Sequence, residues 1–275
     1  MKKKLDVKRV VLYLILLLFL IFYIIPVYTT LTTSLKDLGE VATSSPIKLP
    51  HKIYLGAYRD AAAELKRPFL NSLAFAIPAT FISCVLGSIN GYIFSKYKFK
   101  GSELIFLLFL IGIFLPYQSI LIPLFEIISS LGLYDTFWAL ILTHSAYGIP
   151  ITTLLFRNYY DQIPNELIEA GKVDGYGISG IYSKIILPLS GPAFAMTIIF
   201  QFTNVWNDYL FGLVLTMSAN VRPMTVALAN LKGSFAAAWN IQMAGALLVT
   251  LPTILLFIFL GKYFVRGLLA GSVKG

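Results

Sequence analysis

The sequence is poor in charged residues, cysteine and histidine, and each shortage excludes a class of protein. Only 13% of its 275 residues are charged, whereas a soluble domain carries about a quarter. The single cysteine, Cys84, excludes a disulfide-stapled fold. With His51 and His144 it supplies too few ligands for a Cys/His metal framework, so we expect no bound metal. The chain is instead 57% hydrophobic with a mean hydropathy of +0.78, which excludes a water-soluble globular domain.

Hydrophobic stretches of about 20 residues, the length that a helix needs to cross a bilayer, recur along the chain. They predict six transmembrane helices at about residues 10–30, 70–94, 104–125, 136–156, 187–215 and 241–261. Each must be helical, because unpaired backbone groups find no partner in lipid, and the stretches lack the alternation of barrel strands. The first stretch is too long for a signal peptide and no small-residue cleavage site follows it. We therefore predict an all-α membrane bundle that forms a single domain over residues 1–275.

Basic residues predict which side of the membrane each loop occupies. With the amino terminus inside, the inward segments hold 14 Lys and Arg residues and the outward segments hold eight. Five bases precede the first span, three follow the second, and none follows the third, although the long first outer loop holds six. We predict a multi-pass protein of the cell membrane with both termini in the cytoplasm. The net charge of +9 then reflects orientation and not nucleic-acid binding.

The longest inward segment, residues 157–186 between the fourth and fifth spans, carries the pattern of a short helix. Asp161 can cap a helix whose first turn holds Pro164 and Glu166, because both residue types suit the unpaired amides and positive dipole of a helix start. Gly175 can end this helix. The segment therefore contains more structure than a simple connector needs.

One face of this short helix carries small residues. Leu167, Ala170 and Gly171 follow each other at spacings of three and four, so they share a face. Ala170 and Gly171 are small enough to let another surface approach the helix backbone closely. An amphipathic connector that lies on the membrane surface is the alternative interpretation.

The same segment resembles a family signature. Glu169-Ala170-Gly171 followed by Asp174-Gly175 resembles the Glu-Ala-Ala signature of the permease subunits of binding-protein-dependent ABC importers, and the chain is closest to carbohydrate permeases of the maltose-transporter type. Gly171 departs from the usual second alanine, and Tyr176 stands where a small residue is common. Outside the loop the resemblance extends to Ser34-Leu35-Lys36, Asn71-Ser72-Leu73, Trp206-Asn207-Asp208 and Tyr263-Phe264-Val265-Arg266-Gly267.

This resemblance implies a membrane subunit that is not itself an enzyme and binds no cofactor. The helix would dock into separate ATPase subunits, which bind ATP and Mg²⁺ and drive the bundle between inward-open and outward-open states. The implied coupling residues are Glu166, Leu167, Glu169, Ala170, Gly171, Asp174 and Gly175. The implied partners are a second permease subunit, two ATPase subunits and an external solute-binding protein. The sequence agrees with the expectation that this chain does not itself bind ATP, since it holds no Gly-x-x-x-x-Gly-Lys-Ser/Thr phosphate loop.

Polar residues inside the spans mark a candidate substrate pathway, because burying them is costly unless they pair or face water. The candidates are Gln201, Asn204, Asn207 and Asp208 in the fifth span, and Tyr117 and Gln118 in the third. Gln201, Asn204 and Asp208 repeat at i, i+3 and i+7, which places them on one helical stripe suited to a solute rich in hydroxyl groups.

Structural alternatives exist for several of these residues. Asn207 and Asp208 could mark an interfacial helix end beside an aromatic anchor. Gln118 could bond the carbonyl that a proline frees. We interpret His144 as a bundle histidine with satisfied hydrogen bonds and not as a ligand. Gly87 and Gly91 form a small-x-x-x-small pattern, which predicts close packing between helices.

Two functions remain open at the level of sequence. The resemblance favours the permease of a sugar importer, nearest to a glucose or mannose branch through Phe114-Leu115-Pro116-Tyr117-Gln118 and Pro223-Met224-Thr225-Val226-Ala227-Leu228. The alternative is a self-contained secondary transporter or channel for a small polar solute. Against it, the spans hold few ionisable residues for coupling to an ion gradient, and the two halves of the chain show no clear repeat.

Overall fold

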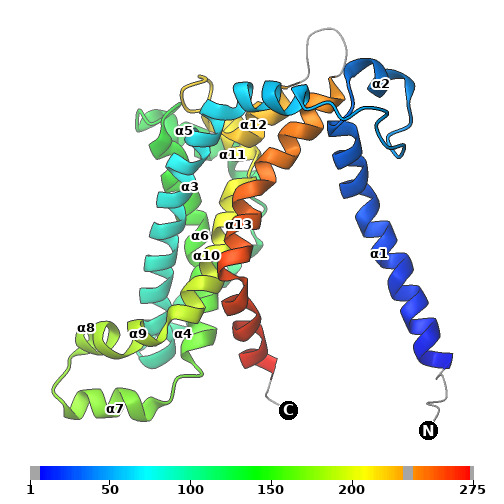
Figure 1. Ribbon diagram of the computed structural model, residues 1–275. Coiled ribbons are helices and arrows are strands. Elements are labelled where there is room, and N and C mark those ends of the chain that lie inside the picture. The colour runs from blue at the N-terminus through cyan, green and yellow to red at the C-terminus, as the bar shows by residue number, and fades with distance from the viewer. Residues whose placement is uncertain (1–6, 232–237, 273–275) are drawn as a thin grey trace. The chain divides into compact units, whose positions relative to one another are not determined.

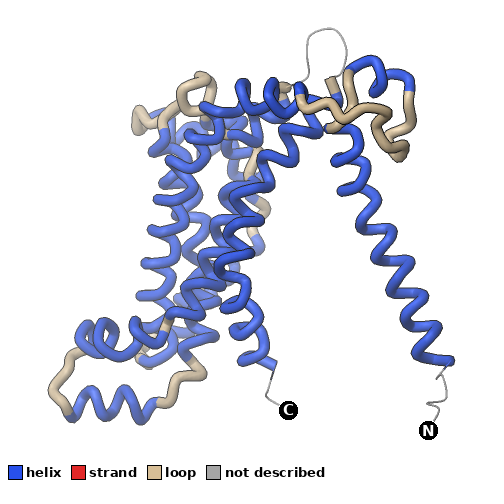
Figure 2. The backbone as a smooth tube through the Cα atoms, viewed as in Figure 1, coloured by secondary structure: helices blue, strands red, loops and turns tan. Residues whose placement is uncertain are grey.

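The computed structural model describes residues 7–231 and 238–272, with residues 264–272 described by their backbone alone. Every regular element in this part of the chain is helical (Figures 1 and 2). Four helices are long and apolar enough to cross a membrane, and two bent helix pairs raise the number of candidate spans to six. The predicted all-α membrane bundle is confirmed. Several bases used in the orientation argument lie outside the described residues, namely Lys2, Lys3, Lys4, Lys232 and Lys274.

Four of the predicted spans lie in single long helices. These helices are α1 (Val7–Ser34), α3 (Gly56–Lys96), α6 (Phe137–Tyr160) and α13 (Trp239–Ser272). They extend beyond the hydrophobic stretches that predict them, because polar residues at a helix end add no hydropathy but still pair their backbone groups along the helix. The prolines inside these helices, such as Pro78 and Pro150, do not end them.

The predicted third and fifth spans differ from expectation because both are bent. In the third, α4 (Ser102–Phe114) meets η1 (Tyr117–Ile120) and α5 (Leu121–Ser130) at 92°, since Pro116 lacks an N–H and forces the residue before it out of the helical region. In the fifth, α8 (Ile178–Ile181), η2 (Tyr182–Ile186) and α9 (Leu187–Leu189) meet α10 (Gly191–Asn207) at 78°. The chain breaks once more before α11 (Leu210–Leu215).

The chain divides into two compact units, and the smaller comprises residues 1–66 and 227–250. Small residues pack it where α3 and α13 begin, since Ala57, Ala61 and Ala244 are fully buried together. The loop after α1 contains α2 (Leu38–Thr43) and is held by Lys36, whose Nζ donates to Ser44 Oγ (2.9 Å) and to the carbonyl of Ser45 (2.8 Å). These contacts fix the loop beside the end of α1.

The larger unit comprises residues 67–226 and 251–275, and α3, α6 and α10 form its centre. Gly87 and Gly91 let α3 approach α6 closely. A Cβ at Gly87 would lie 2.6 Å from Thr152 Cβ, and one at Gly91 would lie 2.7 Å from Phe156 Cβ. Such close contacts exclude any side chain, so the predicted packing role of the two glycines is confirmed.

The helix that the sequence predicts in the inward loop is α7 (Asn165–Val173), which lies with α8 and α9 at one end of this unit (Figure 1). The predicted cap is wrong: α7 begins after Pro164 with no side-chain cap, while Asp161 ends α6 and accepts a hydrogen bond from Ser95 Oγ (2.7 Å). The predicted end is confirmed. Gly175 has φ +84°, and the N–H of Tyr176 bonds the Gly171 carbonyl (2.9 Å), which is a Schellman turn.

Candidate solute pocket and candidate coupling helix

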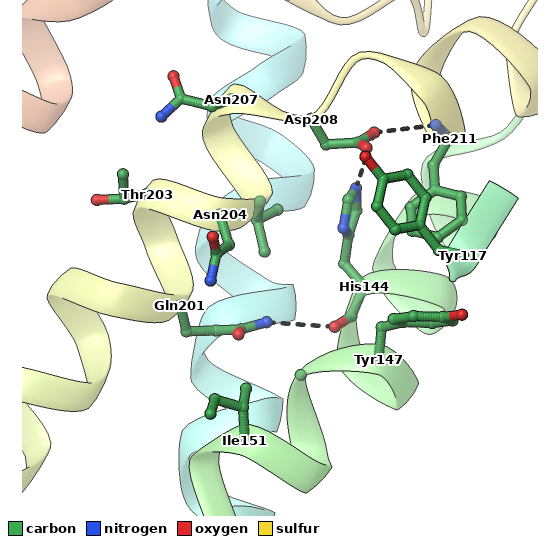
Figure 3. A pocket seen from close by; sticks show the side chains of 12 residues that line it. Tyr117, His144, Tyr147, Ile151, Gln201, Thr203, Asn204, Asn207, Asp208 and Phe211 are labelled. Carbon is green, nitrogen blue, oxygen red and sulfur yellow. Dashed lines mark hydrogen bonds and ion pairs between the residues drawn. The ribbon is translucent and has the colours of Figure 1, made fainter. Parts of the chain in front are cut away.

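A cavity of about 370 Å³ opens beside α6, α10 and α11 in the larger unit (Figure 3). It is lined by Tyr117, His144, Tyr147, Gly148, Ile151, Gln201, Thr203, Asn204, Val205, Asn207, Asp208 and Phe211. Five of the six sequence-predicted pathway residues are therefore brought together. The exception is Gln118, which is exposed in η1 and does not line the cavity.

The three amides of the cavity differ in their contacts. Gln201 is buried, and its Nε2 donates to the His144 carbonyl and to Ser83 Oγ, both at 3.3 Å. Gly148 leaves the space for it, since a Cβ there would lie 2.6 Å from Gln201 Cδ. Asn204 and Asn207 are exposed, and Figure 3 shows Asn207 directed away from His144. Gln201 therefore joins three helices in addition to lining the cavity.

Asp208 is held by the start of α11. Its Oδ2 accepts hydrogen bonds from the backbone N–H of Phe211 (3.1 Å) and of Gly212 (3.2 Å). Carboxylates suit this position because the first amides of a helix lack partners. The alternative that Asp208 marks a helix end is thus compatible with its place in the cavity wall.

His144 lies on α6 and is 5% exposed. Its ring stacks on Phe75 (ring centroids 5.8 Å apart, planes 11° apart) and meets the Phe211 ring edge-on. Its Nε2 lies 3.7 Å from Asp208 Oδ2 and has no hydrogen-bond partner (Figure 3). His144 is buried as predicted, but its hydrogen bonds are not satisfied as predicted.

Aromatic rings form one wall of the cavity. The ring centroid of Phe211 lies 5.5 Å from that of Tyr117 and 5.4 Å from that of Tyr147. Tyr147 was missed at the sequence level, although it follows His144 by three residues and so shares its helix face. Rings beside amides and a carboxylate can hold a solute that has both apolar faces and hydroxyl groups.

The helix α7 packs through one face on its own chain. Ile168 and Gly171 are buried, and a Cβ at Gly171 would lie 2.7 Å from Ile185 Cδ1 and 3.2 Å from Ile181 Cγ1. The close approach that Gly171 permits is therefore made by η2 and α8. The remaining predicted residues, Glu166, Leu167, Glu169, Ala170, Asp174 and Gly175, are exposed, as is Val173 at 88%.

Hydroxyl groups connect the segment after α7 with the bundle. Ser88 Oγ on α3 lies 2.7 Å from Tyr160 OH and 2.9 Å from Tyr182 OH. Ser190 Oγ donates to Tyr160 OH (3.0 Å), and Tyr92 OH donates to the carbonyl of Ile178 (3.0 Å). Displacement of α8 or η2 would thus pull directly on α3, and displacement of Ser190 would pull on α6.

Comparison with known families identifies the chain. Residues 83–269 match the model of the binding-protein-dependent transport system inner membrane component. The chain belongs to this family. It is a multi-pass membrane protein and the permease subunit of an ABC importer, in which ATP is bound by separate ATPase subunits. Family membership decides against the self-contained secondary transporter or channel that the sequence left open.

Several relatives of this permease are known from other organisms. A probable ABC transporter permease protein of Pyrococcus horikoshii is 54% identical over 99% of this chain and 100% of its own length. The xylose/arabinose import permease of Haloferax volcanii is 35% identical (96% and 93% covered), and the osmoprotective compounds uptake permease of Synechocystis is 40% identical (88% and 84% covered). Two of these relatives thus transport different solutes, xylose or arabinose in one and osmoprotective compounds in the other.

The fold also matches a solved structure. A bacterial ABC transporter involved in the import of the acidic polysaccharide alginate has a chain that superposes with a TM-score of 0.82, covering 96% of this chain and 99% of that chain. At 20% identity, this likeness concerns the fold alone.

Proposed function

We propose that this permease moves a neutral sugar, a monosaccharide such as glucose or mannose, into the cell through the cavity beside α6 and α10. The observation that carries the proposal is the composition of the cavity wall, which combines the amide of Asn204 and the carboxylate of Asp208 with the rings of Tyr117 and Tyr147. Sugars need this combination, because their hydroxyl groups require hydrogen-bond partners and their ring faces are apolar. The xylose/arabinose relative supports the same solute class.

The proposal includes α7 as the coupling helix. Its outer face presents Glu166, Glu169 and Ala170, while Ile168 and Gly171 anchor its inner face on the chain. ATPase subunits in the cytoplasm would grip the outer face, and both termini would lie on that same side. A second permease subunit and an external solute-binding protein complete the proposed importer.

The test is uptake by the assembled importer in proteoliposomes, measured beside ATP hydrolysis. Glu169→Lys reverses a charge on the outer face of α7, and Gly175→Pro demands φ near −65° where the backbone has +84°. We expect both variants to hydrolyse ATP while losing most glucose or mannose uptake. The matched control is Gly177→Ala, because Gly177 has φ −75° and a Cβ there meets no atom within 4 Å.

Two outcomes would contradict the proposal. Normal uptake by Glu169→Lys and Gly175→Pro would reject α7 as the coupling element. Uptake of neither sugar by the wild-type importer, despite active ATP hydrolysis, would reject the monosaccharide assignment.

A further inference from the structure

The wall of the solute cavity contains a polar atom that the fold leaves without a partner. Nε2 of His144 is buried, makes no hydrogen bond and points toward Asp208 in Figure 3, and both residues line the cavity. An unmade hydrogen bond at a buried group costs about 1–3 kcal/mol, so folded proteins rarely leave one. The ring itself is packed firmly between Phe75 and Phe211, so the atom cannot turn to another partner without losing these contacts.

The nearest acceptor is close but beyond hydrogen-bond distance. Oδ2 of Asp208 lies 3.7 Å from His144 Nε2, and it already accepts from the N–H groups of Phe211 and Gly212. A carboxylate has about four lone-pair positions, so it can still accept from a solute. The two side chains therefore present a donor and an acceptor side by side at the cavity wall.

A hydroxyl group matches this pair, because it donates and accepts through one oxygen. Its oxygen can sit within hydrogen-bond distance of both His144 Nε2 and Asp208, whose own atoms are too far apart to satisfy each other. A carboxylate on a solute can accept but not donate, and the charge of Asp208 repels it. That repulsion is strong here because the Asp208 side chain is only 12% exposed and so is poorly screened by water.

We propose that His144 and Asp208 form a polarity filter on the substrate pathway, which binds one hydroxyl group of a neutral sugar and rejects sugar acids. This inference rests on the proposed function, since it assigns a role to two residues of the same cavity. It adds the exclusion of anionic sugars and the group of the solute that is recognised.

The test compares D-glucose with D-glucuronate, which carries a carboxylate where glucose carries a hydroxymethyl group. Their affinities are measured on the purified importer, with its second permease and ATPase subunits but without the binding protein. Only the membrane part can then discriminate between the two sugars. We expect the wild type to prefer glucose by about tenfold or more. This comparison needs no variant, and equal affinity for the two sugars would overturn the filter.

Two variants separate the roles of the pair. Asp208→Asn keeps the cap of α11, because Asn caps a helix as well as Asp does, and removes the charge; we expect glucuronate to bind about tenfold more tightly. His144→Phe keeps the ring packing on Phe75 and Phe211 and removes the donor; we expect glucose to bind about tenfold more weakly, with no gain for glucuronate. Co-elution with the ATPase subunits verifies that each variant assembles.

The outcomes distinguish this inference from the proposed function. An unchanged glucose-to-glucuronate ratio in both assembled variants overturns the filter and leaves the cavity as the sugar pathway. If the assembled wild-type importer binds neither sugar, the monosaccharide assignment fails, and the filter is rejected with it.

Discussion

Replacing Gly91 by alanine tests the packing on which the larger unit depends. The new methyl group would lie 2.7 Å from Phe156 Cβ, 2.8 Å from the backbone nitrogen of Arg157 and 3.0 Å from the backbone carbon of Phe156. Two of these atoms belong to the backbone of α6, so no side-chain rotation relieves the overlap and the helices must separate. Overpacking of this kind costs about 1–3 kcal/mol, against a helix-propensity gain of about 1 kcal/mol for replacing glycine.

Because the backbone cannot yield, we expect the upper part of that range and a net loss of about 1–2 kcal/mol. The control is Gly112→Ala in α4, where the new methyl group meets only Pro150 Cγ at 3.8 Å, an ordinary contact. That variant should be neutral or slightly stabilised. Both are measured by equilibrium unfolding of the full chain in detergent. Equal unfolding midpoints for the two variants would refute the argument that α3 and α6 touch at Gly91.

Two further predictions concern single polar groups. Tyr182→Phe removes the 2.9 Å contact with Ser88 and should lower the unfolding free energy by about 0.5–1.5 kcal/mol. We also expect faster hydrogen exchange in η2, and unchanged exchange there would contradict the link between η2 and α3. Burial alone would raise the pKa of Asp135, but hydrogen bonds from the backbone N–H of Met217 (2.8 Å) and Ser218 (3.0 Å) outweigh it and hold this pKa below its usual value. The carboxylate therefore stabilises the fold above about pH 4, the unfolded-state pKa, and this contribution is lost as the pH falls through the lowered pKa. Asp135→Asn, which tolerates the left-handed φ of +58°, should remove that acid-dependent loss in an unfolding series from pH 7 to 3, and a wild-type series without it would contradict the assignment.

Much of the membrane fold could be predicted because hydropathy reports directly on the length of an apolar stretch. It does not report where the axis of a helix changes direction. Pro116 indicates an unwound turn in the third span, but neither the 92° bend there nor the 78° bend at Ser190 could be predicted. The cap at Asp161 was also misjudged, because the sequence does not show that the Asp161 backbone ends α6 or that its carboxylate accepts a hydrogen bond from Ser95 on α3.

The site was predictable where residues share a single helix. Gln201 and Asn204 lie on α10, so their common place in the cavity follows from helical geometry. The predicted stripe is wrong for Asp208, because α10 ends at Asn207 and the start of α11 holds the Asp208 carboxylate. His144 and Tyr147 come from another helix, and nothing in a single sequence shows which face of α6 meets α10. For the same reason the sequence could not show that Tyr117 lines the cavity and Gln118 does not, because the break at Pro116 decides which of the two side chains faces it.

The central claim is that α7 faces the cytoplasm and contacts an ATPase subunit, and thiol labelling at Val173 tests it most directly. Val173 is 88% exposed on α7, and the native Cys84 is 1% exposed, so Val173→Cys introduces one accessible thiol. We predict that a membrane-impermeant reagent labels this thiol in inside-out vesicles stripped of the ATPase subunits, and that adding those subunits back blocks labelling. Labelling in intact cells, or labelling that the ATPase subunits leave unchanged, would contradict the account.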